Sequence, residues 1–212
     1  MVTTALPAIY RPGLAHVSGE VVQRAQRIRL LLTDCDGVLT DGTVYYSARG
    51  EELKRFHMRD GMGVERLRTV AGVDVGIISG ENSPSLQRRA AKLHITELHL
   101  GIRDKLAVLE EIVERRRLSY AEVAYIGDDV NDVAVMERVG LAACPADATP
   151  FAKAASHLVC RTAGGAGVLR EVAEIIIAAR CLPSANGDAP GRYAATSVAP
   201  VRQPCFDERS EW

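Results

Sequence analysis

Short apolar runs alternate with amphipathic stretches along most of this chain. The runs predict buried strands at 28–34, 73–79, 96–100, 123–127, 141–144 and 157–160. The stretches between and around them predict helices at 18–27, 61–71, 84–93, 104–117, 131–139, 150–155 and 168–180. Strands that alternate with helices form a parallel sheet with helices on both faces. The predicted fold class is therefore α/β, with a Rossmann-like sheet.

One segment departs from this alternation. Residues 43–46 and 52–57 have the character of short strands, and 47–51 between them contains Gly50. Two such runs joined by a glycine-containing loop predict a β-hairpin. We expect this hairpin to project from the main sheet as a flap.

The two ends of the chain differ from its middle. Residues 1–17 contain Pro7, Pro12 and Gly13 and have no clear period, so we expect a flexible arm. From Leu182 on, small and polar residues dominate, and we expect 182–212 to be a disordered tail. One folded domain is expected at 18–181.

Composition excludes several classes of protein. The 212 residues are 47% hydrophobic and 25% charged, with a net charge of −1, as in ordinary globular domains. We expect no nucleic-acid partner and no membrane partner, because the chain has neither a basic excess nor a spanning apolar run. The five cysteines are scattered without CxxC spacing, and the N-terminus lacks a secretory pattern, so a cytoplasmic location is expected.

The strongest chemical signal is the sequence DCDGVLTDG, residues 34–42. Asp34 and Asp36 end a predicted strand, and the two-residue repeat of a strand puts both carboxylates on one side. Gly37 then permits a sharp turn. Two carboxylates repel each other, and a hard cation such as Mg²⁺, shared with a phosphate, offsets that repulsion. A surface acidic turn is the simpler alternative, but here the pair ends an apolar run.

A second acidic cluster, GDDVND, ends the predicted strand at 123–127. Asp128 and Asp129 would lie at the same edge of the sheet as Asp34, and Asp132 would lie one turn into the next helix. Helix capping by one aspartate is the common alternative. Three aspartates in so short a stretch exceed what one cap needs, which favours a functional site.

Two single residues complete the pattern. Ser79 ends a predicted strand, where its hydroxyl could bind a phosphate oxygen, although a serine there is often a helix cap. Lys105 begins a predicted helix, a position that disfavours cations. An anion nearby would explain it, whereas a solvated lysine is the alternative.

In this order, the motifs resemble those of the haloacid dehalogenase-like phosphohydrolases, over about residues 28–180. DxDGxxT is followed by a serine, a lysine and GDDxxD. The stretches DGVLTDG, GEELKRF, MRDGMG, IGDDVND and AGGAGVLREV are similar to the branch that acts on 3-deoxy-D-manno-octulosonate 8-phosphate and on nine-carbon ketoacid sugar phosphates. Ala166 differs from that branch, where a basic residue is more usual.

The resemblance implies catalytic roles. Asp34 would attack phosphorus and form an aspartyl phosphate. Asp36 would protonate the leaving sugar oxygen and then accept a proton from water. Ser79 and Lys105 would bind the phosphoryl oxygens.

It also implies a magnesium site. The Asp34 and Asp128 carboxylates and the backbone carbonyl of Asp36 would bind Mg²⁺. Asp129 and Asp132 would not bind the metal directly but would hold Lys105 or the metal-bound waters in place.

Substrate and assembly follow from the same resemblance. Arg59 would bind the carboxylate of the sugar acid, and Thr43 and Gly61 are further candidates for substrate contact. The intervals between the motifs are too short for the cap domain that many related enzymes carry. We therefore expect a homotetramer with shared active sites, in which Tyr45, Tyr46 and the segment 164–167 help to close a neighbour's site.

Other functions remain open. A response-regulator receiver domain also combines aspartates, Mg²⁺, a hydroxyl residue and a lysine, but its acidic pair and its phosphorylated aspartate lie on different strands. The complete acid set argues against an inactive assembly module, and the missing cap against a phosphomutase. Among phosphatases, we expect 3-deoxy-D-manno-octulosonate 8-phosphate as substrate, with a nine-carbon ketoacid sugar 9-phosphate of the sialic acid or KDN type as the alternative.

Overall fold

A computed structural model describes residue 14 and residues 16–182. Its centre is a six-stranded parallel sheet in the order β5-β4-β1-β6-β7-β8. The strands are β1 (Leu30–Thr33), β4 (Asp74–Ile78), β5 (Glu97–His99), β6 (Val123–Ile126), β7 (Leu141–Cys144) and β8 (Leu158–Val159). All six were predicted, with bounds longer by one or two residues at some ends, and the predicted fold class is confirmed.

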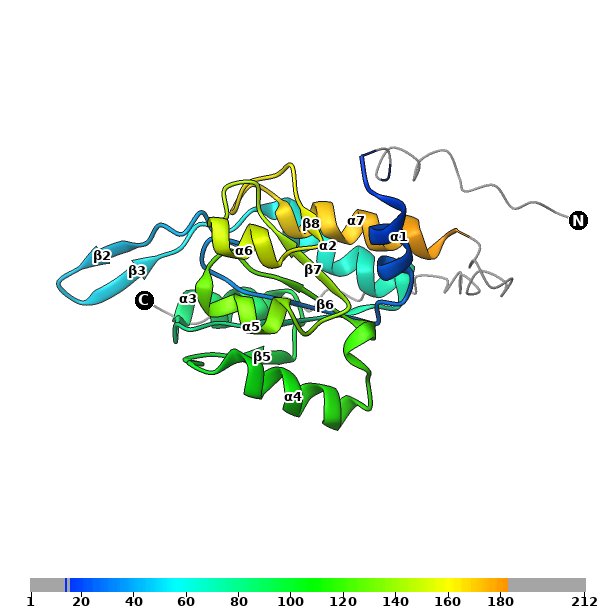
Figure 1. The fold of residues 1–212 in the computed structure, drawn as a ribbon. Coiled ribbons are helices and arrows are strands. Elements are labelled where there is room, and N and C mark those ends of the chain that lie inside the picture. The colour runs from blue at the N-terminus through cyan, green and yellow to red at the C-terminus, as the bar shows by residue number, and fades with distance from the viewer. Residues whose placement is uncertain (1–13, 15, 183–212) are drawn as a thin grey trace, which may run out of the picture.

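Helices cover both faces of the sheet (Figure 1). One face packs against α1 (Gly19–Gln26), α2 (Met58–Arg66), α3 (Pro84–Lys92) and α7 (Val168–Arg180). The other packs against α4 (Lys105–Arg116), α5 (Val133–Met136) and α6 (Pro150–Ala155). Three short helical turns complete the structure: η2 (Leu67–Ala71), η3 (Tyr120–Glu122) and η4 (Val130–Asp132).

Strand β1 shows why the sheet has two cores. Leu31 packs toward α1 and α7, whereas Leu30 and Leu32 pack toward α4 and α5. All three side chains are fully buried. Successive side chains of a strand point to opposite faces, so an apolar run without polar interruption is buried on both sides.

The predicted hairpin is confirmed. Strand β2 (Tyr45–Ser47) pairs antiparallel with β3 (Gly50–Leu53), and the pair extends away from the main sheet (Figure 1). Residues 36–79 are all described and hold this hairpin, α2, η2 and β4. The segment therefore has no separate cap domain, as predicted.

Two helices differ from their predictions. The helix expected at 131–139 is reduced to η4 and the four-residue α5, because Asp132 turns inward at the sheet edge. Helix α2 begins at Met58 rather than Gly61, because Nδ1 of His57 accepts a hydrogen bond from the backbone N–H of Arg59 and caps the helix.

The order of the strands positions the ligand site. The chain leaves β1 toward β4 and β5 on one side, and β6, β7 and β8 lie on the other. In open sheets of this kind, ligands bind beyond the carboxyl ends of the strands where this direction changes, here at β1 and β6.

Most of the predicted arm, residues 1–13 and 15, lies outside the described residues, as does 183–212 of the predicted tail. Of the arm, Leu14 and Val17 are described and pack against the core. None of the described helices is both long and apolar enough for a membrane span.

Candidate active site

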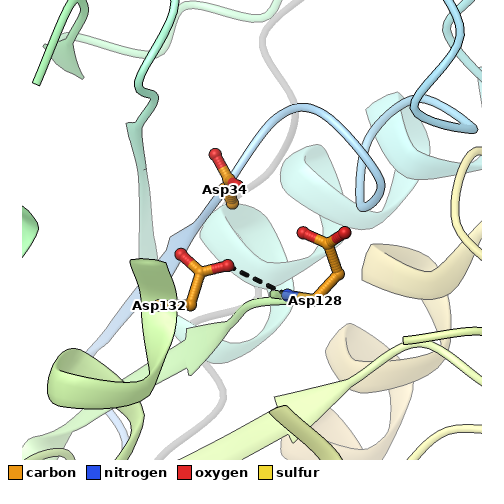
Figure 2. Close-up of side chains that lie close together, drawn as sticks. All are labelled: Asp34, Asp128 and Asp132. Atoms are coloured by element: carbon orange, nitrogen blue, oxygen red, sulfur yellow. Dashed lines mark hydrogen bonds between the residues drawn. The ribbon is translucent and has the colours of Figure 1, made fainter. Parts of the chain in front are cut away.

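Three aspartates meet at the carboxyl edge of the sheet. Asp34 follows β1 directly, and its backbone N–H donates to the carbonyl of Ile126 (2.9 Å), which extends the strand pairing. Asp128 follows β6, and Asp132 lies in η4. One carboxylate oxygen from each lies within 4.8 Å of the others (Figure 2). The predicted convergence of the two acidic motifs is thus observed.

Asp132 is fully buried, and both of its oxygens are occupied. Its Oδ1 accepts hydrogen bonds from Lys105 Nζ (2.7 Å) and the Tyr125 hydroxyl (2.7 Å). Its Oδ2 accepts from the backbone N–H groups of Asp128 (3.0 Å; Figure 2) and Asp129 (3.4 Å). Asp132 therefore orients Lys105, and its own oxygens are taken up by protein donors.

Lys105 is the first residue of α4 and is only 2% exposed. Its ammonium lies 3.0 Å from Asp34 Oδ2 as well as 2.7 Å from Asp132 Oδ1. Burial lowers the pKa of Lys105, but the two carboxylates outweigh this and hold the pKa above its usual value. A lysine at this helix start is therefore explained by the anions it contacts.

The carboxyl groups themselves are perturbed. Burial, reinforced by the charge of Asp132 and opposed by Lys105, raises the pKa of Asp34 to about 7. Burial and the charges of Asp34 and Asp132 raise the pKa of Asp128 to about 7. The single positive charge of Lys105 does not balance the three carboxylates of the cluster. A divalent cation would neutralise the remaining negative charge.

The loop after β1 is shaped by close backbone contact. Gly37 has a φ of 84°, and a Cβ on it would lie 2.0 Å from Asp128 Oδ2. A side chain at residue 37 would therefore displace the Asp128 carboxylate. The backbone N–H of Cys35 also donates to Asp34 Oδ1 (2.7 Å), which fixes the orientation of that carboxylate.

The glycine-rich segment packs against this loop within the same chain. A Cβ on Gly164 would lie 2.0 Å from the carbonyl oxygen of Gly37, and the N–H of Gly165 donates to the carbonyl of Val38 (2.9 Å). Gly164 and Gly165 are thus buried against their own active-site loop. The expectation that 164–167 helps to close a neighbour's site stays a prediction. Only Ala166 of the segment is exposed.

Asp36 pairs with a residue that the sequence analysis did not single out. Both of its carboxylate oxygens contact Lys54 Nζ, at 2.6 and 2.7 Å. Lys54 lies just after β3, within the stretch GEELKRF that carried part of the family resemblance. The resemblance of that stretch could have pointed to Lys54 as a functional residue. The local sequence pattern does not indicate which carboxylate the lysine contacts.

Ser79 lies where predicted, at the end of β4, and is buried. Its backbone is fixed by hydrogen bonds with His99 (2.9 Å) and Ile102 (3.0 Å). Its Oγ accepts from the N–H of Glu81 (3.3 Å). Within residues 16–182, no hydrogen bond joins this hydroxyl to the aspartates. Its predicted phosphate contact stays a prediction.

The side chains of two further candidates are exposed. Asp129 is exposed and its Oδ1 accepts from the N–H of Val130 (2.7 Å), so it caps η4. Thr43 is exposed and donates to Asp41.

Arg59 and Gly61 lie on α2. Arg59 is exposed, its guanidinium has no ion pair with any described residue, and a Cβ on Gly167 would lie 3.7 Å from its Cβ. Gly61 is buried, and a Cβ on it would lie 2.9 Å from Arg89 Nη2 and 3.0 Å from Leu93. Contact between α2 and α3 explains this glycine without a ligand.

Comparison with known proteins agrees with this arrangement. Residues 91–172 match the model of a family described as haloacid dehalogenase-like hydrolase. The chain is 44% identical over 164 residues to 3-deoxy-D-manno-octulosonate 8-phosphate phosphatase from Yersinia pestis, an alignment that covers 77% of this chain and 87% of the relative. The chain belongs to the haloacid dehalogenase-like hydrolases. It is a phosphatase of that family, and the predicted enzyme class is confirmed.

Solved structures of related phosphatases have the same fold. The crystal structure of the Yersinia pestis enzyme superimposes with a TM-score of 0.75 at 45% identity, over 77% of this chain and 88% of that one. The 3-deoxy-D-manno-octulosonate 8-phosphate phosphatase of Moraxella catarrhalis, solved with a magnesium ion, a phosphate ion and a KDO molecule, has a TM-score of 0.73 at 34% identity, over 76% of this chain and 87% of that one.

A metal ion can be tested through its linkage with protons. Because the pKa values of Asp34 and Asp128 are raised from 3.8 to about 7, the metal-free folded state holds protons that the unfolded chain has lost. Protonation of the two carboxyl groups therefore stabilises the folded state. This contribution to the free energy of unfolding is fully present below pH 3.8 and is lost as the pH rises through about 7. Mg²⁺ competes with these protons, so we expect it to raise Tm more at about pH 8 than at about pH 5.5.

Thermal unfolding with and without Mg²⁺ at the two pH values measures this difference. Asp128→Asn should remove most of the Mg²⁺ effect, whereas Asp74→Asn, at an exposed site on β4, should leave it unchanged. An equal rise in Tm at both pH values would contradict the linkage.

Proposed function

We propose that this phosphatase hydrolyses a sugar phosphate through an aspartyl-phosphate intermediate on Asp34, with Mg²⁺ as cofactor. The observation that carries the proposal is the position of the Asp34 carboxylate. It is buried at the end of β1, with Oδ1 held by the Cys35 N–H and Oδ2 beside Lys105. A carboxylate fixed in this way can attack phosphorus without first reorienting.

The proposed reaction has two steps. Asp34 forms a bond to phosphorus while the bond from phosphorus to the sugar oxygen breaks, and Asp36 gives its proton to that oxygen. Water then attacks the phosphorus of the aspartyl phosphate, Asp36 takes a proton from the water, and phosphate leaves. The Asp34 carboxylate is restored at the end.

Charge in the site is the main obstacle to this reaction, because an anionic nucleophile approaches an anionic ester. Lys105 and Ser79 are the proposed partners of the phosphoryl oxygens. Asp34, Asp128 and the backbone carbonyl of Asp36 are the proposed ligands of Mg²⁺, which would neutralise the charge that develops on the phosphoryl group. Asp132 keeps Lys105 in place, and Asp129 is proposed to bind metal-bound water.

For the substrate we propose 3-deoxy-D-manno-octulosonate 8-phosphate, the compound named for the Yersinia pestis relative. Arg59 supports a sugar acid, because its exposed guanidinium has no ion pair with the described residues and could bind a carboxylate. Thr43, exposed at the base of the hairpin, is a further candidate for contact. A phosphate-release assay across 2-keto-3-deoxy sugar acid phosphates of eight and nine carbons would distinguish the two substrate classes.

The nucleophile is tested by Asp34→Asn. The amide cannot attack phosphorus, so we expect phosphate release to fall to the background of the assay. Thermal unfolding should show a folded protein, because Asn keeps the size of the side chain and removes one charge from a repelling cluster. Wild-type turnover by this variant would exclude the aspartyl-phosphate route.

The sugar-acid contact is tested by Arg59→Ala. Loss of a charge-assisted pair should raise KM for the sugar acid phosphate by roughly 10–150-fold, since such a hydrogen bond contributes about 1.5–3 kcal/mol. KM for phenyl phosphate, which has no carboxylate, should hardly change. Arg49→Ala removes another exposed arginine, one paired with Glu52 in the hairpin, and serves as the control. Equal losses on both esters would assign Arg59 to the phosphate or to the fold.

Assembly is the last part of the proposal. Six exposed apolar side chains lie on the hairpin segment and on α2: Val44, Tyr45, Tyr46, Leu53, Met58 and Met62. Tyr46, at 69% exposed, would face water in a monomer. Cyclic association of hairpins would cover these side chains while it brings neighbouring chains to the open site.

We therefore expect a homotetramer, which light scattering after size exclusion would detect as a mass of roughly four times 22.9 kDa. The double substitution of Tyr45 and Tyr46 by Glu should dissociate it and lower activity. Phe151→Glu changes a side chain that is 64% exposed on α6, outside the set of hairpin and α2 residues named above, and should leave the mass unchanged. A fully active monomer would contradict the shared site.

A further inference from the structure

The lysine that contacts Asp36 comes from the hairpin rather than from the sheet. Lys54 Nζ lies 2.6 and 2.7 Å from the two oxygens of the Asp36 carboxylate. The Lys54 side chain is 1% exposed, whereas that of Asp36 is 28% exposed. The ammonium therefore lies behind the carboxylate, on the protein side, and the open side of Asp36 faces outward.

Lys54 is itself held in place from a second direction. Its Nζ lies 3.5 Å from Oε2 of Glu51, and Oε1 of Glu51 accepts a hydrogen bond from the hydroxyl of Ser83. Ser83 is buried and caps α3 through the N–H of Leu86 (3.3 Å). A continuous chain of polar contacts thus runs from Asp36 through Lys54, Glu51 and Ser83 to the start of α3. The ammonium of Lys54 is held between two carboxylates of this chain, those of Asp36 and Glu51.

The two motif aspartates consequently have separate cations. Lys105 contacts Asp34, and Lys54 contacts Asp36. Thr40 adds a hydrogen bond to Asp36 Oδ1 (3.3 Å). Without Lys54, the Asp36 carboxylate would be free to turn toward the other cations of the site, Lys105 and a bound metal, and away from the position that proton transfer requires.

Building on the proposed function, we propose that Lys54 is a positioning residue for Asp36. It fixes the carboxylate in one orientation for both proton transfers. Asp36 gives its proton to the sugar oxygen as the bond to phosphorus breaks, and it takes one from the attacking water in the second step. Lys54 keeps its own protons throughout and acts only through Asp36.

A double-mutant cycle separates this role from a general structural one. Lys54→Met keeps the length of the side chain and removes the charge. We expect it to lower kcat by about 10–100-fold, within the range that one acid–base group contributes, and to change KM little. In an Asp36→Asn background the same substitution should have no further effect on kcat, because the residue it acts through is already absent.

Arg55→Met is the matched control. Arg55 is the next residue of the hairpin and also pairs with a carboxylate of the active-site loop, that of Asp41 (2.6 Å), but not with Asp36. It should keep kcat within about twofold, as is usual for a surface pair. Lys54→Arg, which retains a cation, should restore part of the activity lost in Lys54→Met.

The cycle is run on the sugar acid phosphate and on phenyl phosphate. Activity on phenyl phosphate alone would overturn the proposed substrate. The Lys54 proposal could still be tested, because kcat of the variants can be compared on phenyl phosphate. If Lys54→Met fails to fold, Lys54→Gln replaces it in the same cycle, because the neutral amide can still donate hydrogen bonds to Asp36 and Glu51. Multiplying losses in the double variant, or wild-type kcat in Lys54→Met, would overturn the proposal.

Discussion

Repulsion among carboxylates at one edge of the sheet is the constraint on which the rest of this structure depends. Asp34 and Asp132 are buried and Asp128 is partly buried, so water can do little to screen their charges. Lys105 and the Tyr125 hydroxyl satisfy Asp132, and Lys105 also reaches Asp34. The remaining excess of negative charge is what makes the site suited to a divalent cation, and it explains why a helix begins with a buried lysine.

Holding these charges together requires the surrounding backbone to approach closely. Gly37 leaves room for the Asp128 carboxylate, and Gly164 and Gly165 pack directly on the loop that contains Gly37. The second contact joins segments far apart in the chain, because the turn before α7 returns to the loop after β1. Helix α7 is almost completely buried, so the position of the glycine-rich turn is tied to the core. The geometry of the site and the stability of the domain are therefore closely connected.

The hairpin is attached to the active site through charged side chains at its base. A two-stranded hairpin is only marginally stable alone, and here ion pairs at its base attach it to the active-site loop: Lys54 with Asp36, and Arg55 with Asp41. Its outer part exposes apolar side chains that suit contact with another chain. One short element thus combines ion pairs to the active-site loop with exposed apolar side chains.

The sequence by itself determined the α/β fold, the six strands, the hairpin and the convergence of Asp34 with Asp128. These follow from local features, since apolar runs predict buried strands and parallel strands bring their carboxyl ends to one edge. Only the tertiary structure decided that Lys54 meets Asp36, that Gly164 packs on its own active-site loop, and that Gly61 serves the contact of α2 with α3. Each depends on how distant segments pack, and a local pattern does not encode which side chain a lysine or a missing Cβ will face.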